Sequence, residues 1–357
     1  MIKVKSRGTG KWIGMFGLGV VLATTQPGFA SETTENGEQE LTAECIRMQK
    51  DVNADLGKQN EMGCPPSLEQ MAALMDNPVG NIAMLFTQFD FYKMTNDNIT
   101  DESATKSQYM GIAQFPKGLG DDWNLINRFV WTVPSVPLDQ DKIDTAAGGS
   151  APFGESQGGT LSPAAGPLPI NVFDGRTTGF GDLYYIGLFS PKEAPNMLNG
   201  KFVWGLGFDL GLPTATDDIL GTGKWTAGPS AIGVYLGKKW KIGGLLQQYW
   251  DYAGDDDRDD VSLTNLQYFL YYSLDKVTSI GAGPNIIANW EQESDDRWTV
   301  PVGLGINRTF QFGKVPVRIG VEAHYSVIQP DNIPSNEWDV RFYIIPSAPA
   351  FLFSWMQ

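Results

Sequence analysis

The chain has 357 residues, of which 42% are hydrophobic and 19% charged, and its net charge is −15. A chain this acidic lacks the clustered Lys and Arg that phosphate contacts require, so we exclude nucleic acid as a partner. The chain has only two cysteines and one histidine, too few of the usual ligands to indicate a metal centre. We predict neither a metal nor a cofactor.

Residues 1–30 have the parts of a secretory signal peptide. Four basic residues and no acid precede the apolar run "WIGMFGLGVVLA", and the small residues Gly28 and Ala30 end the segment. Cleavage after Ala30 would leave a mature chain with a net charge of −19. The apolar run is too short for a spanning helix, so a signal anchor is the less favoured interpretation.

Residues 31–78 are predicted to form a helical periplasmic preface to the rest of the chain. It holds Cys45 and Cys64, and two nearby cysteines in an exported protein usually form a disulfide. Closing this loop would contribute roughly 3 kcal/mol to stability. In "SLEQMAALM", Ser67 is followed three residues later by Gln70, the pattern of a capping box at a helix start.

From residue 79 to residue 357 the hydrophobic period is two, which indicates strands with one apolar face. In "VPVRIGVEAHYSV" the apolar Val317, Val321 and Val327 alternate with polar positions such as Arg318 and Glu322. Most of the segments reach ten residues, and a tilted membrane-spanning strand needs about 9–11. About twelve such segments are predicted: 81–93, 107–116, 123–134, 179–190, 201–212, 224–237, 240–253, 263–274, 277–290, 297–311, 316–328 and 338–353.

The connections between these segments alternate between two kinds. Short turns that contain lysine, such as "GKKW", alternate with long or acidic stretches such as "AGDDDRDDVS" at 253–262. In an up-and-down barrel the two kinds lie at opposite ends, as in outer-membrane barrels with short periplasmic turns and longer outer loops. Trp250, Tyr252, Trp290 and Trp298 flank two of the acidic tips and suit an aromatic girdle.

The acidic run also raises a calcium interpretation, because hard cations bind clustered carboxylates. An EF-hand loop needs Gly at its sixth position and Glu at its twelfth, where this chain has Asp260 and Leu266. A solvated loop tip is therefore favoured, and weak divalent binding between several acidic loops stays open. The Gly-, Ser- and Pro-rich stretch 135–177 is predicted to be a flexible outer loop.

The polar face of the strands is predicted to line the lumen, where it either fills the barrel or borders a path for solutes. A Ser-His-acid relay of Ser326, His324 and Glu322 is the catalytic alternative, and it is disfavoured because His324 is expected to face inward. Asn265, Gln267, Tyr249, Tyr271 and Tyr343 share this face. The lumen-lining candidates are Lys241, Gln247, Asn285, Asn289, Arg318, Glu322, His324, Asp339 and Arg341.

Several stretches resemble one bacterial outer-membrane family, named for the meta-cleavage pathway of phenol degradation and often described as transporters. They include "FGDLYYIGLFSP", "GLGFDLGLPTATDDILGTGKWTAGPSAIGVY", "WDYAGDDDRDDVSLTNLQYFLYYSL" and "WTVPVGLGINRTFQFGKVPVRIGVEAHYSV", and together the resemblance covers most of 77–345. It implies an outer-membrane barrel that serves as a channel for small organic solutes. It explains neither the cysteine-containing preface nor the end "YIIPSAPAFLFSWMQ", where Phe353 or Trp355 serves as the terminal aromatic or the closing strand ends near Ile345.

We therefore expect an all-β protein: an up-and-down antiparallel transmembrane β-barrel of about twelve strands with a short helical N-terminal segment. The expected location is the outer membrane of a Gram-negative bacterium, and the expected function is passage of small solutes, aromatic or organic ones among them. A structural or adhesive barrel with a filled lumen is the first alternative, and a membrane-barrel hydrolase is the second. Expected partners are membrane lipid and lipopolysaccharide, the barrel assembly machinery and a small-molecule solute.

Overall fold

The computed structural model describes residues 43–50, 56–96, 100–138, 153–155, 161–163, 173 and 175–349. The predicted signal peptide, the terminal aromatic at Phe353 or Trp355 and most of the loop 135–177 lie outside these ranges. The described residues from Ala43 to Pro349 belong to one compact unit. None of the helices among the described residues is long and apolar enough to cross a membrane.

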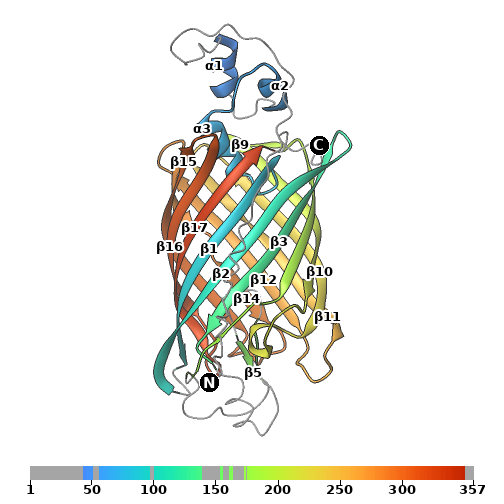
Figure 1. Cartoon of the computed structure of the whole chain (residues 1–357), viewed down its shortest axis with the longest axis vertical. Coiled ribbons are helices and arrows are strands. Elements are labelled where there is room, and N and C mark those ends of the chain that lie inside the picture. The colour runs from blue at the N-terminus through green and yellow to red at the C-terminus, as the bar shows by residue number, and fades with distance from the viewer. Residues whose placement is uncertain are drawn as a thin grey trace, which may run out of the picture. The chain divides into compact units, whose positions relative to one another are not determined.

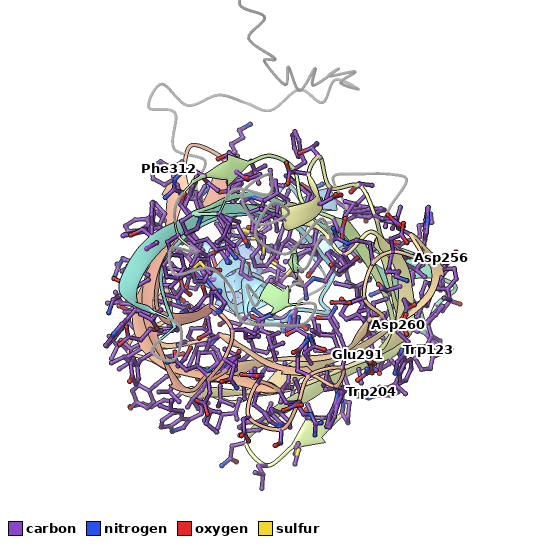
Figure 2. All side chains as sticks on the ribbon, turned by 90° about the horizontal axis from the view of Figure 1, so that it is seen from below. Trp123, Trp204, Asp256, Asp260, Glu291 and Phe312 are labelled. Carbon is purple, nitrogen blue, oxygen red and sulfur yellow. A yellow bond between two sulfur atoms is a disulfide. The ribbon has the colours of Figure 1, made fainter. Side chains whose placement is uncertain are left out.

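The strands form a closed antiparallel barrel with twelve positions around its wall (Figure 1). Each strand pairs with its neighbours in the chain, and the last strand pairs with the first, from Ile82↔Pro349 to Thr95↔Ser335. Closure leaves the twelve-strand wall without an edge strand, and Figure 2 shows the ring as seen along the barrel axis. The wall strands are β1 (Ile82–Asn96), β2 (Thr100–Leu119), β3 (Trp123–Val136), β7 (Leu183–Pro191), β9 (Gly200–Leu212), β10 (Lys224–Leu236), β11 (Trp240–Gly254), β12 (Ser262–Ser273), β13 (Thr278–Ala282) with β14 (Asn285–Asn289), β15 (Trp298–Phe312), β16 (Val315–Ile328) and β17 (Ser335–Pro349).

This arrangement confirms the predicted barrel and most strand positions, with two corrections. Strand β17 continues to Pro349, so an end near Ile345 is wrong. Segment 277–290 is not one strand but the two short strands β13 and β14. Pro284 lies between them, and proline lacks the N–H that an uninterrupted ladder needs.

The break between β13 and β14 also opens the ladder to β15. Pairing stops at Gly281↔Gly305 and resumes at Ile287↔Thr299. Freed from this ladder, the peptide of Gly283 donates and accepts hydrogen bonds with side chains inside the barrel.

The connections lie at the two ends of the barrel as the alternation predicted. We call the end with the tight turns, such as Gly313–Lys314 between β15 and β16, the short-turn end. In the turn between β12 and β13, hydrogen bonds from the backbone of Val277 and Thr278 hold the pKa of Asp275 below its usual value. The opposite, long-loop end carries Asp256, Asp260 and Glu291, which lie on the side facing the viewer in Figure 2.

The connections between the wall strands contain several short elements. Strands β4 (Phe153–Glu155) and β5 (Leu161–Pro163) pair with each other, β6 (Thr177–Thr178) pairs with β3, and β8 (Asn196–Met197) pairs with β9. A 3-10 helix, η1 (Asp218–Leu220), precedes β10. Ile219 and Leu220 of η1 pack in an apolar cluster with Met94, Val136 and Leu138 at the long-loop end.

The outward face of the wall is apolar and ends in aromatic rings at both ends. Trp123 and Trp204 pack edge to face at the short-turn end and lie outside the ring in Figure 2. Trp240 and Trp250 on β11 are ten residues apart, roughly 33 Å along a strand and roughly 25 Å along the barrel axis at a tilt of about 40°. That height matches the apolar band of an outer-membrane barrel. Exposed side chains between the two girdles include Leu85, Phe89, Leu206, Leu246, Leu270, Leu304, Val321, Phe342 and Ile344.

Three helices precede the barrel: α1 (Ala43–Lys50), α2 (Leu56–Glu61) and α3 (Leu68–Met75). The predicted disulfide between Cys45 and Cys64 is present, with the two Cα atoms 5.6 Å apart. The predicted capping box is also present, since the Ser67 hydroxyl accepts from the Gln70 N–H and the Gln70 side chain accepts from the Ser67 N–H. Figure 1 shows α3 at the short-turn end of the barrel.

Candidate functional site

The barrel interior is the candidate site, because side chains at alternate positions of every wall strand enclose cavities there. Eight of the nine predicted lumen-lining residues border these cavities: Lys241, Gln247, Asn285, Arg318, Glu322, His324, Asp339 and Arg341. The ninth, Asn289, lies at the long-loop end of β14, where its side-chain oxygen accepts a hydrogen bond from the Glu291 N–H.

The interior has a polar half and an apolar half. On β16, β17 and β1 the buried inward side chains include Glu322, His324, Asp339, Arg341 and Asp90. On β3, β7, β10 and β11 they are mainly Ile126, Val130, Ile186, Leu188, Ile232, Val234 and Leu245, which form one apolar cluster. A solute in the lumen would therefore contact charged groups on one side and hydrocarbon on the other.

A buried ion pair joins the first and last strands in the polar half. Arg341 Nε lies 2.8 Å from Asp90 Oδ1, and Asp90 is fully buried. Gln88 Nε2 donates to the other oxygen of Asp90 at 2.7 Å. The pair links residues 251 positions apart in the chain, so it can form only when the barrel is closed.

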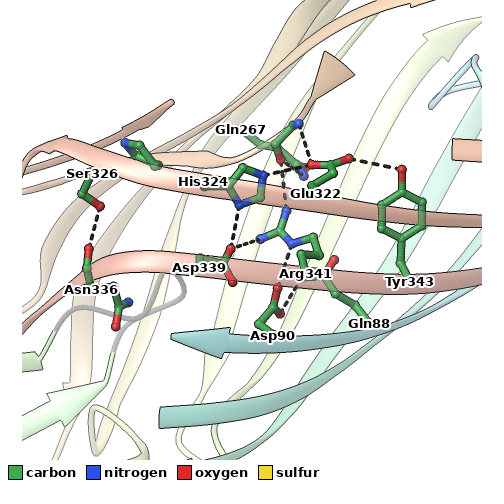
Figure 3. A network of polar contacts seen from close by, with 12 residues as sticks. Gln88, Asp90, Gln267, Glu322, His324, Ser326, Asn336, Asp339, Arg341 and Tyr343 are labelled. Atoms are coloured by element: carbon green, nitrogen blue, oxygen red, sulfur yellow. Dashed lines mark hydrogen bonds and ion pairs between the residues drawn. The ribbon is translucent and has the colours of Figure 1, made fainter. Parts of the chain in front are cut away.

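His324 continues this network toward a second carboxylate (Figure 3). Its Nδ1 lies 2.7 Å from Asp339 Oδ2, and its Nε2 lies 3.0 Å from Glu322 Oε2. A neutral imidazole donates only one hydrogen bond, whereas the doubly protonated ring donates to both carboxylates. Asp339 Oδ2 also lies 3.8 Å from Arg341 Nη2, which connects the histidine to the ion pair.

Glu322 ends the network and receives three donors besides the histidine. The hydroxyls of Tyr271 and Tyr343 donate to its Oε1 at 2.8 and 3.2 Å, and the Gly283 N–H donates to its Oε2 at 3.0 Å. Arg341 Nη1 in turn donates to the Gly283 carbonyl at 3.2 Å. The break in the wall between β13 and β14 is thus sealed by the same side chains that form the charge network.

The geometry does not assemble the serine relay that the sequence suggested. The Ser326 hydroxyl donates to the Asn336 carbonyl at 2.6 Å, and both ring nitrogens of His324 already contact carboxylates. A nucleophilic serine needs its hydroxyl within hydrogen-bond reach of a free ring nitrogen. Within the described residues there is also no group of three or more His, Cys, Asp or Glu side chains arranged to hold a metal ion.

Helix α3 lies in the mouth of the barrel at the short-turn end. Met71 and Met75 pack against Ile82, Tyr343 and Ile345 of the wall. This contact buries the apolar face of α3 against the strands that close the ring.

An ion-pair cluster, which we call the Asp76 latch, fixes the C-terminal end of α3. The Asp76 carboxylate lies 2.8 Å from Arg318 Nη2 and 2.8 Å from Lys241 Nζ. Arg318 also donates to the Ala72 carbonyl at 2.9 Å, where the last turn of a helix has unpaired carbonyls. Because Lys241 lies on β11 and Arg318 on β16, the latch bridges well-separated parts of the wall.

Three cavities share lining residues, one at the short-turn end of the barrel and two inside it. A vestibule of about 960 Å³ lies beside α3 at the short-turn end and shares Asp76 and Lys241 with a middle cavity of about 140 Å³. The middle cavity shares Gln88, Ile112, Arg128, Gln267 and Arg341 with a third cavity of about 90 Å³. The third cavity extends past His324 and Asp339 toward Ser326 and Asn336.

Four side chains of the site were not predicted from the sequence: Gln88, Asp90 and Arg128 of the wall, and Asp76 after α3. A usable signal was present, because an ionisable residue in the middle of a spanning strand must face the lumen. Asp90 stands between Phe89 and Phe91, which are both exposed on the outer face. The sequence did not predict which side chains these residues contact, because the contacting residues lie on strands far away in the chain.

Comparisons with known proteins assign no family to this chain. No family model matches the chain, and no curated protein matches it either. An outer membrane channel from Pseudomonas putida F1 is 18% identical, with a TM-score of 0.47 and coverage of 75% of this chain and 94% of that one. Outer membrane phospholipase A from Escherichia coli is 9% identical, with a TM-score of 0.39 and coverage of 78% and 98%. A Pseudomonas aeruginosa FadL homologue is 8% identical, with a TM-score of 0.34 and coverage of 78% and 94%.

Proposed function

We propose that this protein is an outer-membrane channel that lets small solutes, aromatic or organic ones among them, pass through the barrel. Its own surface supports the location. The ring has no free edge, the outward face is apolar over roughly 25 Å, and aromatic girdles border that band. A soluble protein would leave such a continuous apolar surface in water at high cost.

The observation that carries the channel function is the series of three cavities that share lining residues. A filled barrel would pack its inward side chains against each other along the whole axis. Here the middle cavity alone has room for roughly five water molecules. The residues that it shares with the next cavity, such as Gln88, Gln267 and Arg341, have long side chains whose rotamer changes can widen the passage.

The orientation follows from the connections. The short-turn end, with α3 and the disulfide, would face the periplasm, and the acidic long-loop end would face outward. Membrane lipid would cover the apolar band, and lipopolysaccharide would surround the outer loops. Like other barrels of this kind, the chain would require the assembly machinery of the outer membrane.

The test is conductance of the purified protein in a planar bilayer. Ile112 borders both inner cavities, so Ile112→Trp should narrow their junction and lower the single-channel conductance at least about twofold. Phe89→Trp changes an exposed residue on the outer face of β1 and is the matched control, with unchanged conductance. Folded wild-type protein that conducts no ions would favour the filled structural barrel instead.

A further inference from the structure

Arg128 is an inward arginine that stands in the apolar half of the barrel. It lies in the middle of β3, and its side chain is only 6% exposed. Its register neighbours are Gln114 on β2 and Ile186 on β7. The next inward residues on its own strand are Ile126 and Val130, so no carboxylate flanks it along the strand.

Within the described part of the chain, Arg128 has no ion-pair partner, and its buried Nε has no hydrogen-bond partner. Other inward cations differ in this respect. Arg341 pairs with Asp90, and Arg318 and Lys241 both pair with Asp76. A buried guanidinium without an ion-pair partner is costly. The wall offers one carboxylate in the same register row, Asp209 beyond Ile186, but its Oδ2 accepts from Ser230 and the described residues show no ion pair between it and Arg128. A further anion would therefore stabilise the guanidinium.

The space in front of Arg128 has the shape and chemistry for such an anion. Arg128 borders both inner cavities, and the larger one has a volume of about 140 Å³. An apolar protein cavity of about 150 Å³ accepts a benzene molecule. Apolar groups and amides line part of the two cavities, among them Phe86, Ile112, Leu245, Phe269, Gln88 and Gln267. Charged side chains line the rest, among them Lys241, Arg318, Glu322, Asp339 and Arg341.

We propose that the cavity around Arg128 is a binding site for a small organic monocarboxylate whose apolar body is about the size of a benzene ring. The planar guanidinium would take the carboxylate by two parallel hydrogen bonds. The apolar part of the lining would hold the hydrocarbon body of the ligand. This assignment rests on the proposed channel function, because it names the solute class that the path favours.

The first experiment measures binding in detergent by titration calorimetry, with benzoate as the probe and benzyl alcohol as its neutral counterpart. Wild-type protein should bind benzoate more tightly. Arg128→Met should weaken benzoate binding roughly 10- to 100-fold, as expected for loss of a charged hydrogen-bond donor, and leave benzyl alcohol binding within about twofold. The matched control is Arg308→Met, since Arg308 lies half-exposed beside Asp275 at the short-turn end and should leave both affinities unchanged.

Thermal stability separates a binding role from a structural one. If Arg128 has no partner in the folded wall, Arg128→Met should unfold at the same temperature as the wild type or at a higher one. A clear fall in the unfolding temperature would reveal a structural counter-charge and overturn the proposal. Equal affinity of the wild type for benzoate and benzyl alcohol would overturn it as well.

Conductance distinguishes failure of this inference from failure of the channel function. Benzoate should reduce the current that the wild-type channel carries in chloride salt, and this reduction should be absent in Arg128→Met. That result supports both the channel function and the Arg128 site. A channel that conducts but responds equally to benzoate and benzyl alcohol contradicts the Arg128 site and leaves the channel standing. Benzoate binding that depends on Arg128 in a protein without conductance supports the site and contradicts the channel.

Discussion

Arg341→Met is expected to destabilise the barrel by about 3–5 kcal/mol, because it leaves a buried carboxylate without its cation. The carboxylate is Asp90, which is fully buried and 2.8 Å from Arg341 Nε. After the substitution, Asp90 would keep the hydrogen bond from Gln88 and lose its ion pair. Asp339 would lose its longer contact with the guanidinium and keep His324 at 2.7 Å.

A double-mutant cycle isolates the pair from other effects of the substitution. Asp90→Asn combined with Arg341→Met removes both charges. The double variant should therefore lose less free energy of unfolding than the sum of the losses in the two single variants. The coupling energy should exceed about 2 kcal/mol, at the upper part of the range for contacting residues. Recovery should be incomplete, because Arg341 also donates to the Gly283 carbonyl at the break in the wall.

The matched control is a second ion pair across the same two strands. Lys93 Nζ lies 2.6 Å from Glu337 Oε2, and these side chains are 49% and 24% exposed. Because solvent screens an exposed pair, Lys93→Met should cost at most about 1 kcal/mol. The two substitutions remove similar contacts from the β1–β17 seam and differ mainly in burial.

Urea unfolding and refolding in lipid vesicles, followed by tryptophan fluorescence, measures the free energy of unfolding in each variant. The reasoning is refuted if Arg341→Met lies within about 1 kcal/mol of Lys93→Met, or if the cycle shows no coupling. Either result would mean that water reaches Asp90 in the folded barrel and screens the pair.

Three further predictions concern topology, the disulfide and the latch. A cysteine probe at Asp257 should react with an impermeant reagent on intact cells, whereas one at Lys239 should not; equal labelling would refute the proposed orientation. Non-reducing digestion and mass spectrometry should find Cys45 linked to Cys64, and free alkylation of both without reductant would contradict the pairing. Asp76→Asn should raise the open probability in a planar bilayer about 30-fold, since it weakens two ion pairs of about 1 kcal/mol each, and an unchanged current would show that α3 does not control the path.

The barrel and the direction of its side chains follow from local pattern. Alternation with period two places Glu322 and His324 on the face opposite Val321, and this holds whichever strand lies next to it. The spacing of the turns sets the strand lengths, and the alternation of turn types assigns them to the two ends. The disulfide and the capping box were predictable for the same reason, since each joins residues close in the sequence.

The contacts that define the site required the folded barrel. Asp90 contacts Arg341 only because the first strand pairs with the last. The sequence of neither strand alone predicts which strand it will pair with. The same applies to Asp76, whose two cationic partners come from β11 and β16. Local alternation determines which face a side chain takes, but ring closure determines which charges become buried together. It also determines that Arg128 is left facing a cavity, because its register neighbours Gln114 and Ile186 carry no charge.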